Sequence, residues 1–106
     1  MSDASCAFVL HLTAKPGERS ALLAKIGPFF DALARDETFI RAYIHEAADD
    51  PDLLVVYEAW AMTASEFMPH HRASEAVAEH NPELEPHVAK REMRWLVGPA
   101  AWASSA

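Results

Sequence analysis

Residues 53–60 form an unbroken stretch, Leu-Leu-Val-Val-Tyr-Glu-Ala-Trp, that is apolar except for one acid near its end. Side chains alternate between the two faces of a strand, so one face carries Leu54, Val56, Glu58 and Trp60, and the other carries Leu53, Val55, Tyr57 and Ala59. A strand with one solvated face would alternate apolar with polar residues, so this stretch predicts a strand that is covered on both faces. A buried carboxylate is costly without a partner, so the environment of Glu58 is the main question that this strand raises.

Length and composition limit what can surround this strand. The 106 residues, 51% of them hydrophobic, predict one domain with an ordered core over about residues 6–98 and a mobile tail at 99–106. A net charge of −7 without a basic cluster argues against nucleic-acid binding. No apolar run approaches the roughly 20 residues of a membrane span. Residues 1–5 lack the features of a secretory signal, so we expect a cytoplasmic protein. The single cysteine, Cys6, excludes an internal disulfide, and we expect it to be a buried, inert thiol.

Hydrophobic periodicity predicts the elements of the first half of the chain. Residues 6–13 alternate as a strand, with Phe8, Leu10 and Leu12 on one face. After a turn at 15–18, a helix to about residue 36 carries an apolar stripe made of Leu22, Leu23, Ile26, Phe29, Phe30 and Leu33. Residues 38–46 form a second strand, and the turn at 49–52 predicts an antiparallel hairpin with the strand at 53–60.

The second half of the chain is expected to hold one helix and one strand. Thr63 and Glu66 match a capping box, and the helix that begins there is expected to run to about residue 80, with a distortion at Pro69. Residues 81–86 contain two prolines and predict an irregular connector. Residues 89–97 alternate as a last strand, which the Gly-Pro pair at 98–99 ends.

The resulting order is βαββαβ, an α+β arrangement of the ferredoxin-like type. Its four-stranded antiparallel sheet carries two helices on one face. The other face stays uncovered although the first and third strands are apolar there too, and a monomer would expose a large apolar patch. The same face of a second copy is the simplest cover, so we expect a two-fold homodimer that forms an α/β barrel.

The run Tyr57-Glu58-Ala59-Trp60, followed by Phe67 and His70 in the next helix, resembles the antibiotic biosynthesis monooxygenase family of dimeric α+β barrels. The resemblance extends over about residues 8–97. Members of this family include cofactor-free oxygenases of quinols and polyketide anthrones, haem-degrading proteins and an isomerase-like branch. The resemblance implies a pocket between sheet and helices, with Val56, Glu58 and Trp60 facing Phe67, His70 and His71. Substrate-binding positions would further include Phe8 and Leu10.

Helical spacing independently places Phe67, His70, His71, Ser74, Val77 and Ala78 on one stripe that must face the sheet. Glu58 with His70 or His71 would form an acid/base pair, in which the carboxylate holds one histidine tautomer and raises the pKa of that histidine. Trp60 would offer a flat wall to an aromatic molecule. We therefore expect a cofactor-independent monooxygenase, without a metal, that acts with oxygen on a small aromatic, quinol or polyketide-like substrate.

Two other functions are compatible with the same residues: a dimeric small-molecule-binding module without chemistry, and an isomerase that uses the same acid/base pair. Structural roles also compete, because Glu58 could pair with Arg41, Arg91 or Arg94, and Trp60 could belong to the core. Adjacent histidines diverge on a helix, so one of the pair at 70–71 should face solvent.

The chain also departs from the family at named positions. Val56 and Phe67 stand where the oxygenases that it resembles carry an asparagine and, nearby, a tyrosine. Haem-degrading members use an asparagine, a tryptophan and a histidine, where this chain has Leu10, His70 and His80. Only His80 fits that set, so we expect no bound haem.

Overall fold

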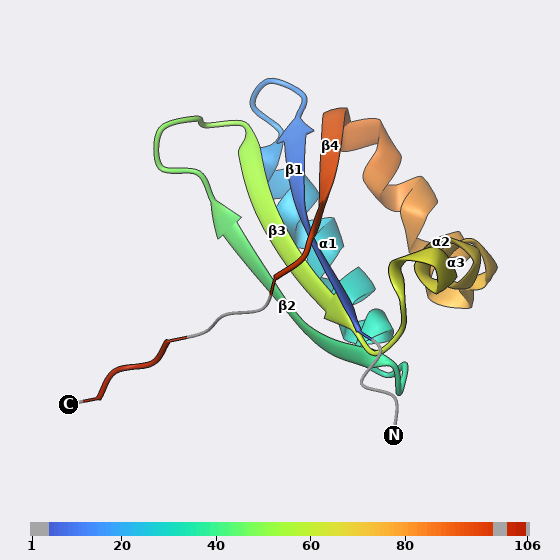
Figure 1. Ribbon diagram of the computed structural model, residues 1–106. Coiled ribbons are helices and arrows are strands. Elements are labelled where there is room, and N and C mark those ends of the chain that lie inside the picture. Colours follow the sequence, from blue (N-terminus) through green and yellow to red (C-terminus); the bar gives the residue numbers. More distant parts are fainter. Residues whose placement is uncertain (1–4, 99–101, 106) are drawn as a thin grey trace.

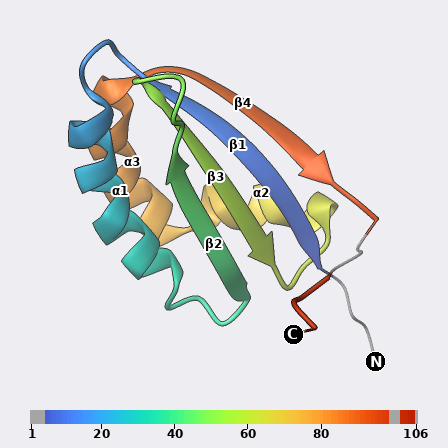
Figure 2. The same cartoon turned by 90° about the vertical axis from the view of Figure 1, so that its left-hand side faces the viewer.

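A four-stranded antiparallel sheet in the order β2-β3-β1-β4 organises the computed structural model, which describes residues 5–98 and 102–105 (Figure 1). The strands are β1 (Cys6–Ala14), β2 (Phe39–Glu46), β3 (Leu53–Trp60) and β4 (Val88–Leu96). The helices are α1 (Arg19–Leu33), α2 (Ala64–Ala73), α3 (Glu75–Leu84) and the 3-10 turn η1 (Glu85–His87). Figures 1 and 2 show the helices on one side of the sheet and no helix of the described residues on the other. The expected α+β, ferredoxin-like fold is confirmed, and the dimeric barrel stays a prediction.

β3 lies inside the sheet, between β1 and β2. In the antiparallel register, Glu58 is opposite Phe8 on β1 and opposite Ala42 on β2. The bounds of β3 are those predicted from its two-sided apolar pattern. The predicted hairpin between β2 and β3 is also present. Arg19 stabilises the turn of this hairpin, because the Nη1 of Arg19 donates hydrogen bonds to the carbonyl oxygens of Ala47 (3.0 Å) and Asp50 (2.7 Å).

The core lies between the sheet and α1. Four side chains of the predicted apolar stripe are buried: Leu22, Ile26, Phe29 and Leu33. They pack in one cluster with sheet residues such as Phe8, Leu12, Leu54 and Trp60. Burying one such side chain contributes about 1.5–3 kcal/mol to the free energy of unfolding, so this layer stabilises most of the domain.

The single helix expected from residue 63 to about residue 80 is wrong, because two helices meet at Ser74. The backbone of Ser74 is extended (φ −72°, ψ 126°), and its hydroxyl accepts a hydrogen bond from the Val77 amide at 3.3 Å, as a helix cap does. The chain therefore breaks at Ser74 and not at Pro69, which lies inside α2. The connector expected at 81–86 is also wrong, since α3 continues through Pro82 and η1 follows it directly.

Other expectations concern the ends of the chain. Residues 99–101 and 106 of the expected tail lie outside the described residues, and residues 102–105 have no regular secondary structure. Cys6 is buried as expected, and burial raises the pKa of its thiol, as do Glu58 and Glu66 to a smaller extent. In the part of the chain that the structure describes, no helix is both long and apolar enough to cross a membrane.

The capping box at the start of α2 is present as predicted, with Thr63 Oγ1 accepting from the Glu66 amide and the Glu66 carboxylate accepting from the Thr63 amide. We expect Thr63→Ala to lower the free energy of unfolding by about 1 kcal/mol, because an amide at the helix start loses its acceptor. Urea unfolding followed by circular dichroism measures this. Ser20→Ala in the exposed first turn of α1 is the control; an equal loss there would contradict the capping role.

Candidate functional site

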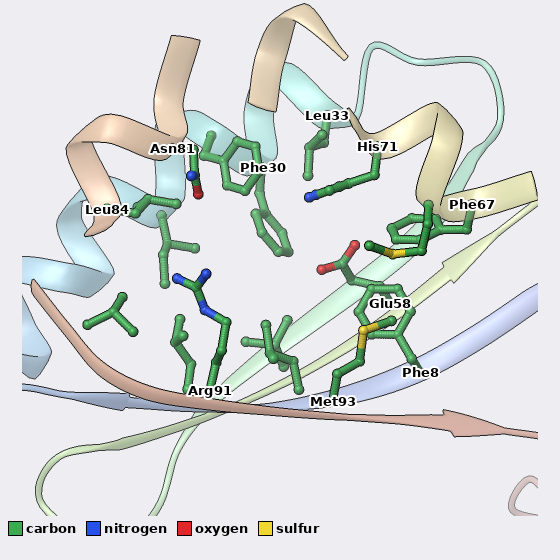
Figure 3. Close-up of a pocket in the computed structure, with 17 residues that line it drawn as sticks. Phe8, Phe30, Leu33, Glu58, Phe67, His71, Asn81, Leu84, Arg91 and Met93 are labelled. Carbon is green, nitrogen blue, oxygen red and sulfur yellow. The ribbon is translucent and has the colours of Figure 1, made fainter. Parts of the chain in front are cut away.

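A cavity of about 260 Å³ lies between the sheet and the three α-helices (Figure 3). Thirteen of its 17 lining residues are apolar. The sheet contributes Phe8, Leu10, Leu12, Val56, Val88 and Met93; the helices contribute Ile26, Phe29, Phe30, Leu33, Phe67, Met68 and Leu84. Such a lining favours an apolar or aromatic ligand and excludes most water. Among the predicted substrate-binding residues, the structure brings Phe8, Leu10, Val56 and Phe67 together here.

The four polar residues of the lining stand at two ends of the cavity. Figure 3 shows Glu58 of β3 and His71 of α2 facing one another at one end, and Asn81 of α3 and Arg91 of β4 at the other. Apolar side chains line the cavity between these two ends. A ligand in this cavity would therefore meet one acid/base end and one end that offers hydrogen-bond donors.

Glu58 is the buried polar residue of the sheet, with 7% of its surface exposed. Trp60 Nε1 donates a hydrogen bond of 2.9 Å to Glu58 Oε1. Oε2 has no hydrogen-bond partner within residues 5–98 and 102–105, whereas every fully buried side-chain nitrogen or oxygen described there has one. Oε2 is therefore accessible, and the open space beside it is the cavity. Burial raises the pKa of Glu58 to about 7, against the smaller, lowering effect of the Trp60 hydrogen bond.

The alternative in which Glu58 forms an ion pair with an arginine is wrong. No ion pair of Glu58 exists in the described part of the chain. Strand alternation places Arg41 and Arg94 on the opposite face of the sheet, and Arg91 Nη2 donates instead to Glu85 Oε2 at 2.7 Å. An uncompensated carboxyl group in an apolar wall is a common feature of general acids and bases.

His70, expected as one candidate partner of Glu58, lies outside the cavity lining. Its Nε2 is 2.6 Å from Asp36 Oδ2, just after the end of α1. Oδ1 of the same carboxylate accepts from the amide (2.9 Å) and hydroxyl (2.6 Å) of Thr38. Burial alone would raise the pKa of Asp36, but the hydrogen bonds from Thr38 and His70 lower it overall. His70 thus ties α2 to the end of α1.

His71 is the histidine that lines the cavity, and its ring stacks on Phe67 with centroids 5.3 Å apart. It makes no hydrogen bond to Glu58 or to any other residue in the described ranges. Burial lowers the pKa of His71, and the positive charges of His70, Arg72 and Arg91 lower it further. The expectation that a carboxylate raises the pKa of the site histidine is therefore wrong, and the surroundings of His71 favour its neutral imidazole.

Trp60, expected as a wall of the pocket, lies in the core instead, with 2% of its surface exposed. Its ring packs edge-on against Phe39 and Phe67, at centroid distances of 5.1 and 5.5 Å. Because only its Nε1 reaches toward the site, Trp60 positions Glu58 and does not touch the cavity.

Of the four polar residues of the lining, the sequence did not lead us to place Asn81 and Arg91 in the pocket. Alternation along the last strand puts Arg91 on the same face as Met93, so the pattern carried that signal. Asn81 gave no such signal, because its segment was expected to be an irregular connector. Within the described residues, no group of three or more histidine, cysteine, aspartate or glutamate side chains is placed to hold a metal ion.

Comparisons with known proteins agree with this fold. The family model described as "Antibiotic biosynthesis monooxygenase" matches residues 7–83. The chain belongs to this family. That match includes β1, β3, α2 and most of α3, and therefore every polar residue of the cavity except Arg91. A comparison with curated proteins gives no match.

Solved structures with the same fold share little sequence with the chain. SnoaB, described as a cofactor-independent oxygenase from Streptomyces nogalater, superimposes with a TM-score of 0.78 at 16% identity, covering 95% of this chain and 99% of SnoaB. A conserved protein from Methanosarcina mazei Go1 gives 0.74 at 17% identity, covering 89% and 92%. A protein of unknown function from Bacteroides thetaiotaomicron gives 0.75 at 10% identity, covering 90% and 98%. At these identities the likeness establishes the fold alone.

The raised pKa of Glu58 predicts a specific loss of stability with pH. Between the ordinary value of 4.5 and about 7, this carboxyl is protonated in the folded chain and ionised in the unfolded chain. Its contribution to the free energy of unfolding therefore falls as pH rises through that window, by roughly 3 kcal/mol in total, and is constant above it. Glu58→Gln should remove this dependence and be the more stable protein above pH 7.

Urea unfolding at a series of pH values compares the two proteins. Glu37→Gln, at an exposed position after α1, is the matched control and should follow the wild-type curve. If wild type and Glu58→Gln gave parallel curves of unfolding free energy against pH, the pKa of the Glu58 carboxyl would not be raised in the folded protein.

Proposed function

We propose that this protein is a monooxygenase that works without a cofactor on a small aromatic substrate with an ionisable hydroxyl or benzylic group. The observation that carries the proposal is the accessible Oε2 of Glu58 in an apolar cavity, on a carboxyl whose pKa burial raises to about 7. Such a group is a stronger base than an ordinary carboxylate and is still half ionised near neutral pH. Membership of the antibiotic biosynthesis monooxygenase family supports the same chemistry.

The reaction balances without any other electron donor. Glu58 removes a proton from the substrate and leaves an electron-rich enolate or phenolate. This anion gives one electron to oxygen, and the carbon radical then combines with superoxide to form a carbon–oxygen bond. The peroxide takes up a proton from the Glu58 carboxyl. The carbon that bears it then loses its remaining C–H hydrogen as a proton, which the Glu58 carboxylate accepts and passes to the departing hydroxide, so that the oxygen–oxygen bond breaks, water leaves and a carbonyl forms. One oxygen atom ends in the product and the other in water, with all electrons supplied by the substrate.

His71 and the apolar lining have separate roles in this scheme. A neutral imidazole both donates and accepts hydrogen bonds, so His71 is suited to hold the substrate oxygen opposite Glu58. The surrounding phenylalanines, leucines and methionines keep water from the radical pair and the peroxide. The volume of about 260 Å³ lies just below the usual range of ligand pockets, which favours substrates of one or two rings over larger polyketides.

We also propose that a second copy of the chain covers the free face of the sheet. On that face Val9, Leu53, Val55 and Tyr57 are half-buried, and Tyr43 and Leu96 expose 55% and 40% of their surfaces. Tyr43 and Tyr57 are register partners whose rings lie 6.0 Å apart, so they form one continuous apolar surface across two strands. Packing this surface against its own two-fold copy removes it from water.

Oxygen uptake in the presence of a hydroquinone of one or two rings tests the reaction. We expect Glu58→Gln to lower kcat/KM roughly 100-fold or more, since the amide cannot accept a proton. For the wild type, kcat/KM should rise with pH through a pKa of about 7, because the ionised form of Glu58 is the base. Glu37→Gln should match the wild type in both measurements.

Three results would contradict the proposed reaction. Equal oxygen uptake by wild type and Glu58→Gln would show that Glu58 is not the base. Tight binding of an aromatic ligand without any uptake would favour a binding module, and turnover without oxygen would favour an isomerase.

Light scattering after size exclusion tests the dimer. Tyr57→Glu places a charge between Val9 and Tyr43 on the free face and should convert dimers to monomers, because an unpaired charge is costly to bury. Ala24→Glu, on the exposed side of α1, should stay dimeric. A folded wild-type monomer at all concentrations would overturn this proposal.

A further inference from the structure

We propose that the cavity binds a planar phenol carrying a carboxylate at the end remote from its hydroxyl group, with Arg91 as the residue that selects the carboxylate. This proposal rests on the proposed function in one respect: it takes the cavity to be the substrate site. It goes further by specifying that the substrate is an anion, where its carboxylate lies, and which residue binds that carboxylate.

The guanidinium of Arg91 points into the cavity from β4, toward Asn81 on α3 (Figure 3). A guanidinium has five N–H donors in one plane. Within residues 5–98 and 102–105, its hydrogen bonding is limited to the contact of Nη2 with Glu85 Oε2, at 2.7 Å. Glu85 therefore fixes one edge of the group and leaves further donors for a ligand. Asn81 adds an amide beside them, so this end of the cavity suits a planar acceptor pair such as a carboxylate.

The positive charge of Arg91 affects His71 at the opposite end of the cavity. Arg91 is one of the positive charges that lower the pKa of His71, so its electrostatic effect extends across the cavity. The other acid in the lining, Glu58, is protonated in about half of the molecules near pH 7. Below neutral pH, the lining thus carries one permanent cation, Arg91, which is half-exposed and paired on one edge with Glu85, and a mostly neutral acid, which favours an anionic ligand over a cationic one.

Strand register fixes the direction in which such a ligand would lie. Arg91 is opposite Leu12 on β1, whereas Glu58 is opposite Phe8. These β1 positions are four residues apart, so the two rows are roughly 13 Å apart along the strand. Between the rows lie Leu10, Val56 and Met93, which bound the middle of the cavity. A rigid aromatic molecule with its carboxylate and hydroxyl at opposite ends spans this arrangement, and one with adjacent groups does not.

Binding without turnover tests the proposal. The probes are para-hydroxycinnamate, its neutral amide, and ortho-hydroxycinnamate, each titrated anaerobically into the full-length protein by calorimetry at about pH 6, where Glu58 is mostly protonated. We expect wild type to bind para-hydroxycinnamate roughly tenfold or more tightly than the amide, as for a charged hydrogen bond. The ortho isomer has the same charge and composition and should bind more weakly than the para compound.

Variants assign the preference to Arg91. Arg91→Gln should bring the affinities for acid and amide within about twofold of one another, whereas Arg91→Lys should keep part of the preference. Arg94→Gln is the matched control, since it removes the same charge from β4 on the opposite face of the sheet and should leave the preference unchanged. Glu85→Gln should tighten binding of the acid, because it removes a competing carboxylate from the Arg91 guanidinium.

Three outcomes would overturn the proposal: equal binding of acid and amide by wild type, equal loss of the preference in Arg94→Gln and Arg91→Gln, or binding of the ortho isomer as tight as that of the para isomer. The wild-type comparisons need no variant to fold. Because binding is measured without oxygen, a confirmed preference together with absent oxygen uptake would reject the monooxygenase and keep the ligand class. Oxygen uptake with a hydroquinone but no preference for the acid would keep the monooxygenase and reject the proposed ligand class.

Discussion

The hydrogen bond from Trp60 Nε1 to Glu58 Oε1 is the interaction on which the site depends, because it fixes a carboxyl group that the rest of the fold buries. Both residues lie on the same face of β3, two positions apart, inside the sheet. The indole is held by edge-on contacts with Phe39 and Phe67, so it cannot turn away. One carboxyl oxygen is thereby directed to the indole and the other to the cavity. A buried ionised acid is costly, and here the one available donor offsets only part of that cost.

The second requirement of the site is the orientation of α2, which a contact outside the cavity supplies. Asp36 accepts hydrogen bonds from Thr38 and lies 2.6 Å from His70, so the end of α1 is tied to α2. Neighbouring side chains on a helix diverge by about 100°. Once His70 is held on Asp36, the next residue, His71, must point elsewhere, and it points over Phe67 into the cavity. The two adjacent histidines thus divide into one that positions the helix and one that meets a ligand.

The fold was predictable because the strands show clear alternation, and β3 was predictable to the residue because both its faces are apolar. The break between α2 and α3 was not. Prolines at 69 and 82 suggested interruptions, yet each removes only one backbone hydrogen bond and stays within a helix, while Ser74 gives the cap that starts a new one. The choice between His70 and His71 depended on Asp36, which lies 34 residues away in sequence, so no local pattern could have decided it.

The two ends of the cavity are coupled through their charges. Arg91 lowers the pKa of His71, so a carboxylate bound to Arg91 would cancel part of that effect and let the pKa of His71 rise. The same bound anion would hold the Glu58 carboxyl in its protonated form to a higher pH. An acidic substrate would therefore bring the pKa of His71 closer to neutral pH, where this imidazole can take up a proton and return it, and would move the pKa of Glu58 upward from about 7. A neutral substrate of the same shape would leave His71 a weaker base, so the arginine end would influence proton transfer at the far end without touching the reacting atoms.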